Sequence, residues 1–251
     1  MSQSLLKAIQ LLDCFDENPE LTLLELVEIS KMPKTTVFRL VSSLVEAGLL
    51  VKVKYSSHDV RYKMGLKLLE LGMRVNKQLE YREIALPYMK ELNAKLNESV
   101  HLAVIEKDET VYVEKLDSTK PLRLIIKIGA RIPLYKGSAS KVLLANLKKT
   151  EQEEYLKKLK LNKLDEHTFD NIEQLVKELQ EIREKGYSYS KEEIYKDIIG
   201  YSCPIFDNSG KILAAMGVSI PIIEFTEEKG EHILNEVLKT ANIISKELGY
   251  K

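Results

Sequence analysis

Residues 21–50, LTLLELVEISKMPKTTVFRLVSSLVEAGLL, constrain the fold most strongly, because start and stop signals for two short helices follow one another closely. Thr22 and Glu25 form a capping-box pattern ahead of an apolar run, which predicts a helix that begins near residue 22. Pro33 suits the first turn of a second helix, since its missing N–H costs nothing there. Gly48 suits the left-handed residue that closes this helix. The turn between the two helices has three or four residues, which is the spacing of a helix-turn-helix.

The predicted helices each have an apolar side that can pack into one core. An earlier helix is expected in SLLKAIQLLDCF, residues 4–15, with an inward stripe made of Leu5, Ile9, Leu12 and Phe15. On the helix that begins at Pro33, the inward side consists of Val37, Leu40, Val41, Leu44 and Val45.

The other side of this second helix is polar, and no acidic residue occurs on it before Glu46. Small hydroxyls and an arginine close to a helix N-terminus can approach base edges and phosphates together. A solvated face of an ordinary helix has a similar composition, so this pattern alone favours neither interpretation. The candidate DNA-contacting residues of this face are Lys34, Thr35, Thr36, Phe38, Arg39 and Ser42.

The following segment, LLVKVKYSSHDVRYKMG, predicts a β-hairpin with a polar turn at residues 56–59. Residues 31–77 hold ten basic and three acidic side chains, although the whole chain has no net charge. A hairpin with a basic face after a helix-turn-helix predicts a winged helix on double-stranded DNA, with the polar helix face in the major groove. Alternation along the strands places Val51, Val53, Val60 and Tyr62 on one face and Lys52, Lys54, Arg61 and Lys63 on the other.

An alternative function is a sensor or interaction module whose winged helix contacts protein instead of DNA. Four aligned cations favour DNA, because a protein-binding wing does not need them. One winged helix buries too little surface for a tight specific site, so two copies are expected to act on a palindromic operator. The chain is therefore expected to form a dimer or a tetramer.

Residues 65–97 have a nearly continuous helical pattern, with Pro87 as a break or kink, and the domain boundary is expected near residue 80. Leu66, Leu69 and Met73 could pack against the wing or form a dimer contact, and the pattern does not decide between these.

The remaining residues alternate strands with helices, which predicts an α+β domain built on an antiparallel sheet. Strand pairs are expected in residues 99–116, 122–135 and 198–221, the last turning at Asn208-Ser209-Gly210. Helices are expected in residues 138–147, 150–161 and 171–186. A terminal helix capped by Thr226 is expected to turn Ile233, Val237, Ile244 and Leu248 inward.

Several classes of function have no support in the sequence. No apolar run approaches the roughly 20 residues of a membrane span, and the first residues lack a signal-peptide pattern, so a cytoplasmic protein is expected. Cys14 and Cys203 are far apart and suit reduced core positions, and the four histidines are scattered, so neither a metal nor a cofactor is expected. The SASK motif at residues 138–141 resembles a nucleophile motif but lacks the accompanying elements. It is better interpreted as a helix N-terminus that binds an anion, and no enzyme activity is expected.

Three separated segments resemble the IclR (isocitrate lyase regulator) family of transcription factors over nearly the whole chain. They are the helix-turn-helix with RYKMGLKLLELG, then IGARIPLYKGSASKVLLANL, then GYSYSKEEIYKDIIGYSCPIFDNSGKILAAMGVSIP. The family pattern has Gly where this chain has Lys31 and Ser140. The resemblance implies a winged helix-turn-helix domain (1–66), a linker helix (67–80) and a GAF-like effector-binding and oligomerisation domain (81–251).

The resemblance also implies a ligand-responsive regulator, more often a repressor, of a small catabolic operon. Its implied effector contacts are Ser138, Ala139, Ser190, Gly200, Gly217 and Ser219. Hydroxyls and backbone donors without a fixed carboxylate suit a small anionic metabolite such as a sugar acid or keto acid. Gly217 is expected to leave room for the effector, so that Gly217→Leu would fill the pocket in a folded protein.

Overall fold

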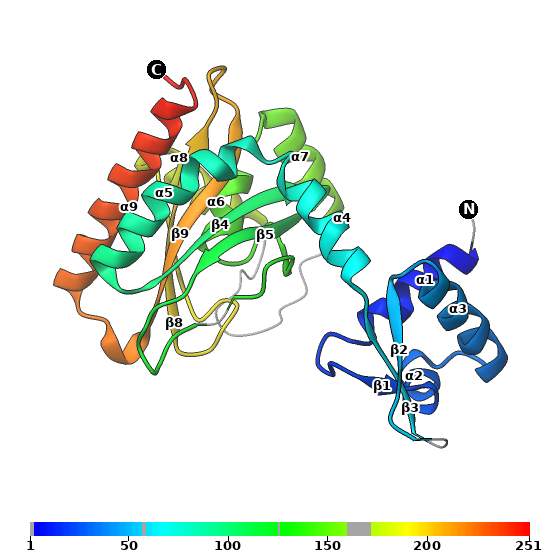
Figure 1. Cartoon of the computed structure of the whole chain (residues 1–251). Helices are drawn as coiled ribbons and strands as arrows, with labels where there is room; N and C mark the ends of the chain where they lie inside the picture. The colour runs from blue at the N-terminus through cyan, green and yellow to red at the C-terminus, as the bar shows by residue number, and fades with distance from the viewer. Residues whose placement is uncertain (1–2, 57–58, 125, 160–171) are drawn as a thin grey trace. The chain divides into compact units, whose positions relative to one another are not determined.

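The computed structural model describes residues 3–56, 59–124, 126–159 and 172–251, which divide into two compact units, residues 1–79 and residues 80–251. Figure 1 shows the helices and strands of both units. The buried side chains that the structure describes form one hydrophobic cluster in the first unit and two in the second. Both units combine helices with antiparallel strands, which confirms the predicted α+β class.

The first unit is a helix-turn-helix followed by a small sheet. Its elements are α1 (Gln3–Asp13), β1 (Leu21–Thr22), α2 (Leu23–Ser30), α3 (Lys34–Glu46), β2 (Leu50–Lys54), β3 (Val60–Met64) and α4 (Leu66–Asn76). The strands pair antiparallel in the order β1-β3-β2. Ser57 and His58 of the predicted hairpin turn lie outside the described residues.

The predicted helix ends are confirmed. The Thr22 hydroxyl accepts a hydrogen bond from the Glu25 amide at 3.3 Å, and the Glu25 carboxylate accepts from the Thr22 amide at 2.7 Å. Pro33 directly precedes α3, and Gly48 has a φ of 73° after its end. Lys31 ends α2 with a φ of 55°, so a lysine holds the left-handed position where the resembled family has glycine.

The predicted inward stripe of α1 is only half right. Leu12 and Phe15 are buried, whereas Leu5 and Ile9 are 63% and 48% exposed. The core begins at Ala8 and continues through Leu11, so the stripe runs Ala8, Leu11, Leu12, Phe15. Ile9 falls beside this stripe, and Leu5 lies in the turn before it begins.

The second unit contains a six-stranded antiparallel sheet. Its strand order is β6-β5-β4-β9-β8-β7. Its helices are α5 (Glu80–Leu96), α6 (Ser138–Ala145), α7 (Lys149–Lys158), α8 (Ile172–Lys185) and α9 (Glu227–Glu247), with a short 3-10 turn at Ile222–Glu224. Its strands are β4 (Ser99–Glu106), β5 (Glu109–Leu116), β6 (Arg131–Pro133), β7 (Ser188–Lys191), β8 (Ile198–Phe206) and β9 (Ile212–Pro221).

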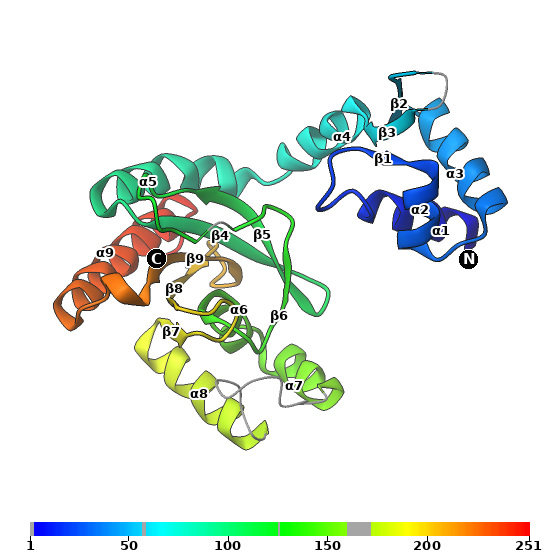
Figure 2. The same cartoon turned by 90° about the horizontal axis from the view of Figure 1, so that it is seen from below.

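Helices cover both faces of this sheet. Figure 2 shows α5 and α9 on one side of it and α6 and α8 on the other. Leu92 of α5 and Ile233 of α9 share one apolar cluster with Leu102, Met216 and other sheet residues. On the other face, residues of α6 and α8 share a second cluster with the sheet, so α6 is enclosed between the sheet and α8.

Three details of this unit differ from the prediction. Only Arg131–Pro133 of the predicted 122–135 strand pair is a strand among the described residues, and the Leu124 carbonyl accepts from the side-chain hydroxyl of Ser99 at 3.0 Å. Strand β7 was not predicted. Pro87 does not break the helix but lies inside α5, where it is exposed to solvent, so water can bind the carbonyl that its missing N–H leaves free.

Candidate functional site

The outward face of α3 carries exposed polar and basic side chains. Lys34, Thr35, Phe38, Arg39 and Ser42 are exposed and Thr36 is half-buried, while the apolar side of the helix is buried. Within the described part of the chain, neither Lys34 nor Arg39 forms an ion pair. The Ser42 hydroxyl donates to the Phe38 carbonyl at 2.8 Å, so its oxygen remains available to accept. This face offers donors, an exposed aromatic ring and cations to a partner.

The prediction of one basic face on the hairpin is wrong. Lys52 is opposite Tyr62, and Val53 is opposite Arg61. Residues directly opposite in an antiparallel pair lie on the same face. Lys52 and Lys54 therefore share a face with Tyr62, and Arg61 and Lys63 share the other face with Val51 and Val53.

The two pairs of hairpin cations also differ in their partners. Arg61 forms an ion pair with Asp59 at 3.0 Å, which raises the pKa of the guanidinium through a hydrogen bond. Lys63 lies 3.9 Å from the Glu20 carboxylate. No ion pair involves Lys52 or Lys54 among the residues that the structure describes. Of the six predicted DNA-contacting cations, Lys34, Arg39, Lys52 and Lys54 thus form no ion pair among the described residues.

A small polar cavity lies between the sheet of the second unit and the N-terminal end of α6. The pairing register places Ser190, Gly200 and Ser219 side by side on β7, β8 and β9. A Cβ added at Gly200 would lie 2.7 Å from the Ser138 hydroxyl oxygen and 3.0 Å from that of Ser190. The cavity is lined by His101, Tyr112, Leu124, Ser138, Ser190, Glu193, Ile194, Tyr195, Ile198, Gly200 and Ser219.

Two of the predicted effector contacts do not line this cavity. Ala139 packs in the apolar cluster behind α6. Gly217 leaves no room for a ligand, because a Cβ there would lie 2.3 Å from the Ser202 hydroxyl and 2.4 Å from the His101 Nε2 atom. These side chains flank Gly217 on the neighbouring strands, and they fill the space that was expected to hold a ligand.

The cavity contains a carboxylate, contrary to the expectation from sequence. Glu193 Oε2 accepts from the Gly137 amide at 2.8 Å, and Glu193 Oε1 lies 2.6 Å from Lys141 Nζ. Lys141 is 1% exposed and also lies 2.6 Å from Glu178 Oε1 on α8. Burial raises the pKa of Glu193 above its usual range. A carboxylate of the protein itself therefore occupies the amide of Gly137, directly before α6.

His101 was missed by the sequence reasoning. It is 2% exposed, its ring meets that of Tyr112 edge-on at 5.2 Å, and burial lowers its pKa to about 4. Neither ring nitrogen has a hydrogen-bond partner among the described residues. A polar residue at an inward position of the apolar run SVHLAVI was the one available signal.

The cavity is small, and one segment contributes three of its lining residues. Its volume of about 30 Å³ holds one or two water molecules. Glu193, Ile194 and Tyr195 come from the connection between β7 and β8. Glu192 and Asp197 lie before and after these residues in the chain, with φ angles of 57° and 58°. This left-handed conformation costs non-glycine residues energy.

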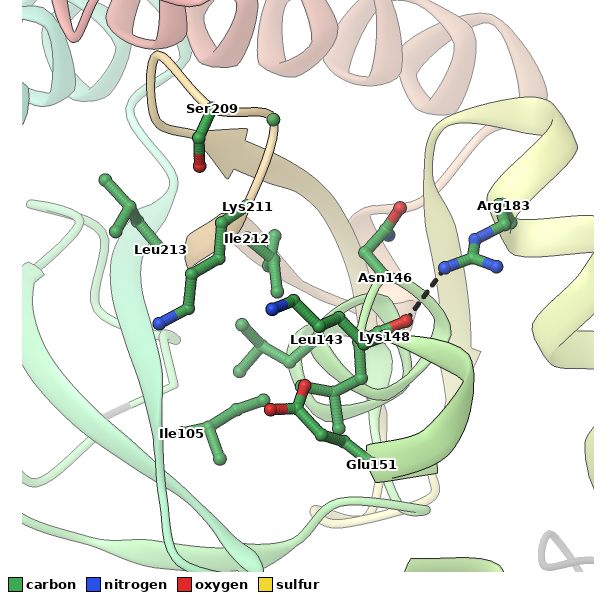
Figure 3. Close-up of a pocket in the computed structure, with 12 residues that line it drawn as sticks. Ile105, Leu143, Asn146, Lys148, Glu151, Arg183, Ser209, Lys211, Ile212 and Leu213 are labelled. Atoms are coloured by element: carbon green, nitrogen blue, oxygen red, sulfur yellow. Dashed lines mark hydrogen bonds between the residues drawn. The ribbon is translucent and has the colours of Figure 1, made fainter. Parts of the chain in front are cut away.

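A larger pocket lies at the other end of α6 (Figure 3). Its volume is about 630 Å³, and its lining includes Lys148, Arg183, Lys211 and Glu151. Arg183 donates to the Leu147 carbonyl at 2.8 Å. None of the predicted effector contacts lines this pocket. A large volume by itself does not identify a ligand site.

Other kinds of site find no support in the described part of the chain. Its His, Cys, Asp and Glu side chains form no group that could hold a metal ion. No helix found there is long and apolar enough to cross a membrane. Cys14 and Cys203 are not disulfide-bonded, and burial raises the pKa of Cys203 to about 12.

Comparisons with known proteins match both units. Residues 4–54 match the IclR helix-turn-helix domain, and residues 73–246 match the C-terminal domain of bacterial IclR transcriptional regulators. The HTH-type transcriptional regulator KipR of Bacillus subtilis is 36% identical over 99% of this chain and 98% of its own. An IclR crystal structure from Thermotoga maritima superposes with a TM-score of 0.83 at 30% identity, covering 100% of both chains. An IclR homologue from Microbacterium hydrocarbonoxydans, complexed with 4-hydroxybenzoate, gives a TM-score of 0.80 at 25% identity, covering 98% of this chain and 100% of that one.

Proposed function

The chain belongs to the IclR family of bacterial transcriptional regulators, and we propose that it is a repressor that leaves its operator when a small acidic metabolite binds the cavity. The observation that carries the proposal is the outward face of α3, where exposed hydroxyls and cations lie without acidic partners among the described residues. The relatives of this chain are named as regulators and not as enzymes. The protein acts in the cytoplasm, where the DNA of a bacterium lies.

In this proposal α3 enters the major groove. Arg39, near the middle of the exposed face, reads a base edge, while Lys34, Lys52 and Lys54 contact phosphates. Arg61 and Lys63 contribute less, because their acidic neighbours already balance their charge. Thr35, Thr36, Phe38 and Ser42 complete the surface that meets the groove.

The effector acts by opening the cavity. The volume of about 30 Å³ is too small for a sugar acid or keto acid, so the residues that close the cavity must move when one binds. That movement would disturb the contacts of Glu193 with Lys141 and Gly137, and through Lys141 the packing of α8. The hydroxyls of Ser138, Ser190 and Ser219 would then bind the metabolite. The 4-hydroxybenzoate complex of one relative supports an acid as effector.

Self-association follows from the operator that this mode of binding requires. Leu66, Leu69 and Met73 on α4 are 81%, 62% and 51% exposed. An apolar row of this kind supports a contact between two copies. We propose that a dimer, or a tetramer of two dimers, places paired α3 helices on a palindromic operator.

We expect Arg39→Ala to cost roughly 1–3 kcal/mol of affinity for the operator and to relax preference at one or two base pairs. The reason is that Arg39 is an exposed cation of α3 that forms no ion pair within the described residues. Fluorescence anisotropy with labelled duplexes from the DNA beside the gene, and with random duplexes, measures both effects.

The double variant Lys52→Ala/Lys54→Ala is the matched control. It should weaken binding to every duplex alike and flatten the slope of log K against log salt by about 0.9 for each phosphate that is no longer neutralised. Arg61→Ala/Lys63→Ala should change the slope less. Equal loss of affinity for operator and random duplexes in Arg39→Ala would show that Arg39 contacts only phosphate.

A further inference from the structure

His101 is a buried base whose polar atoms have no partner in the described protein. Both ring nitrogens lack a hydrogen bond within the described residues, and the side chain lines the polar cavity. Buried polar groups in folded proteins nearly always find a partner, and those that do not require an explanation. A bound ligand that supplies the missing partner is one such explanation.

The groups around His101 include titratable side chains from several elements. Tyr112 of β5 meets the ring edge-on, and Glu193 and Tyr195 line the cavity with it. Lys115 of β5 is directly opposite His101 in the strand pairing, but its ammonium group is paired with Asp117 at 3.0 Å. From β8, β9 and α6 come Ser202, Gly217 and Ser138, none of which titrates in this range.

Charge makes the cavity unfavourable for an acid. Among the described residues no lysine or arginine lines it, and the ammonium group of Lys141 behind it is held between Glu178 and Glu193. A carboxylate that enters beside Glu193 therefore meets a like charge, and the described lining offers it no lysine or arginine. His101 is the one lining base in this described part of the chain that could supply a positive charge.

We propose that His101 recognises the carboxylate of an acidic effector and takes up one proton from solvent as the acid binds. The proton joins a ring nitrogen, which then donates a hydrogen bond to the carboxylate, and the acid itself stays ionised. This rests on the proposed function only in taking the cavity as the effector site. The positive charge that pairs with the acid is thus a proton taken from solvent, and not a permanently charged side chain.

The consequence is binding that depends on pH. Burial holds the pKa of His101 near 4 in the empty cavity, so the ring is neutral at pH 5.5–7.5. A paired carboxylate raises that pKa. The affinity for the acid should therefore fall about tenfold for each unit by which pH rises, until pH reaches the raised pKa of His101 in the complex. The amide of the same acid needs no proton and should show no such dependence.

The experiment is calorimetric titration of the full chain, without DNA, in buffers that differ in their heat of ionisation. The probes are 4-hydroxybenzoate, pyruvate and gluconate, each with its neutral amide, between pH 5.5 and 7.5. For at least one acid we expect uptake approaching one proton at pH 6 and binding at least tenfold tighter than that of its amide. Histidine-labelled NMR should show one imidazole changing from neutral to protonated on addition of that acid.

Two variants show which side chain takes up the proton. His101→Gln keeps a hydrogen-bonding side chain that cannot be protonated, so it should remove the uptake, the pH dependence and the NMR change. Glu193→Gln should keep the uptake, since the carboxyl of Glu193 is not the acceptor. Binding of an acid without uptake, uptake that persists in His101→Gln or disappears in Glu193→Gln, or no binding by any acid would overturn the proposal. Because DNA is absent, these outcomes are independent of whether α3 reads an operator.

Discussion

Lys141→Met is expected to lower the free energy of unfolding of residues 80–251 by about 3–5 kcal/mol, the usual cost of removing one member of a buried ion pair. Lys141 is 1% exposed and lies 2.6 Å from carboxylate oxygens of both Glu178 and Glu193. Without the ammonium group, Glu193 remains in the cavity with no cation beside it. Urea unfolding of the full chain, followed by far-UV circular dichroism, measures the loss.

The double variant Lys141→Met/Glu193→Gln tests the cause. It removes the stranded charge, so it should be more stable than Lys141→Met alone by at least half of the loss. The loss in Lys141→Met should also shrink as pH falls from 8 to 5, because protonation of Glu193, whose pKa burial already raises, removes the unpaired charge. A loss below about 1 kcal/mol at pH 8 would contradict this view of the ion pair.

Gly217→Ala is expected to destabilise the same unit by about 2–3 kcal/mol, the upper part of the range for overpacking a core. The added Cβ would come within 2.3 Å of the Ser202 hydroxyl and 2.4 Å of His101 Nε2, and all three residues lie in the interior of adjacent strands. Gly217→Leu should prevent folding of the unit, instead of blocking an effector in a folded protein. Thermal unfolding of the full chain checks both expectations.

A double-mutant cycle with His101→Ala separates this clash from other effects of the substitution. Removing the imidazole frees space in front of position 217, so Gly217→Ala should cost at least about 1 kcal/mol less in the His101→Ala background, within the usual range for residues in contact. Additive losses would show that a Cβ at position 217 and the His101 ring do not compete for space.

Stability should also depend on pH through His101. Its pKa is lowered from 6.5 to about 4 in the folded chain, so the unfolded chain binds more protons in this range. Stability therefore decreases as pH falls from 6.5 towards 4, by about 3 kcal/mol from this group alone. The pH dependence of His101→Gln, compared with that of the wild type, isolates this contribution.

The helix-turn-helix could be predicted because its signals are local. The Thr22–Glu25 capping box and Gly48 each act within a few residues, and the structure has them at the predicted helix ends. The hairpin faces could not be assigned in the same way. Alternation along each strand was correct, but the register across strands pairs Lys52 with Tyr62, and a shift by one residue reverses which side chains share a face.

The residues of the cavity also divide into those that could be predicted from the sequence and those that could not. Ser138, Ser190, Gly200 and Ser219, taken from the family resemblance, do line it. The local signal for His101 is a single polar residue in an apolar strand, and Glu193 lies in a charged connection without a distinguishing pattern. Only the sheet register and the position of α6 bring them together. The same register explains Gly217, whose missing side chain makes room for the imidazole of His101.

DNA reading by α3 can be measured by selection of DNA duplexes with the full-length protein from a library with a randomised central segment. We expect enrichment of an inverted repeat whose half-sites lie about one helical turn, or a multiple of it, apart. In Arg39→Ala the same selection should lose preference at one or two positions of each half-site. Folded protein that recovers duplexes without any enriched sequence would contradict the claim that α3 reads DNA.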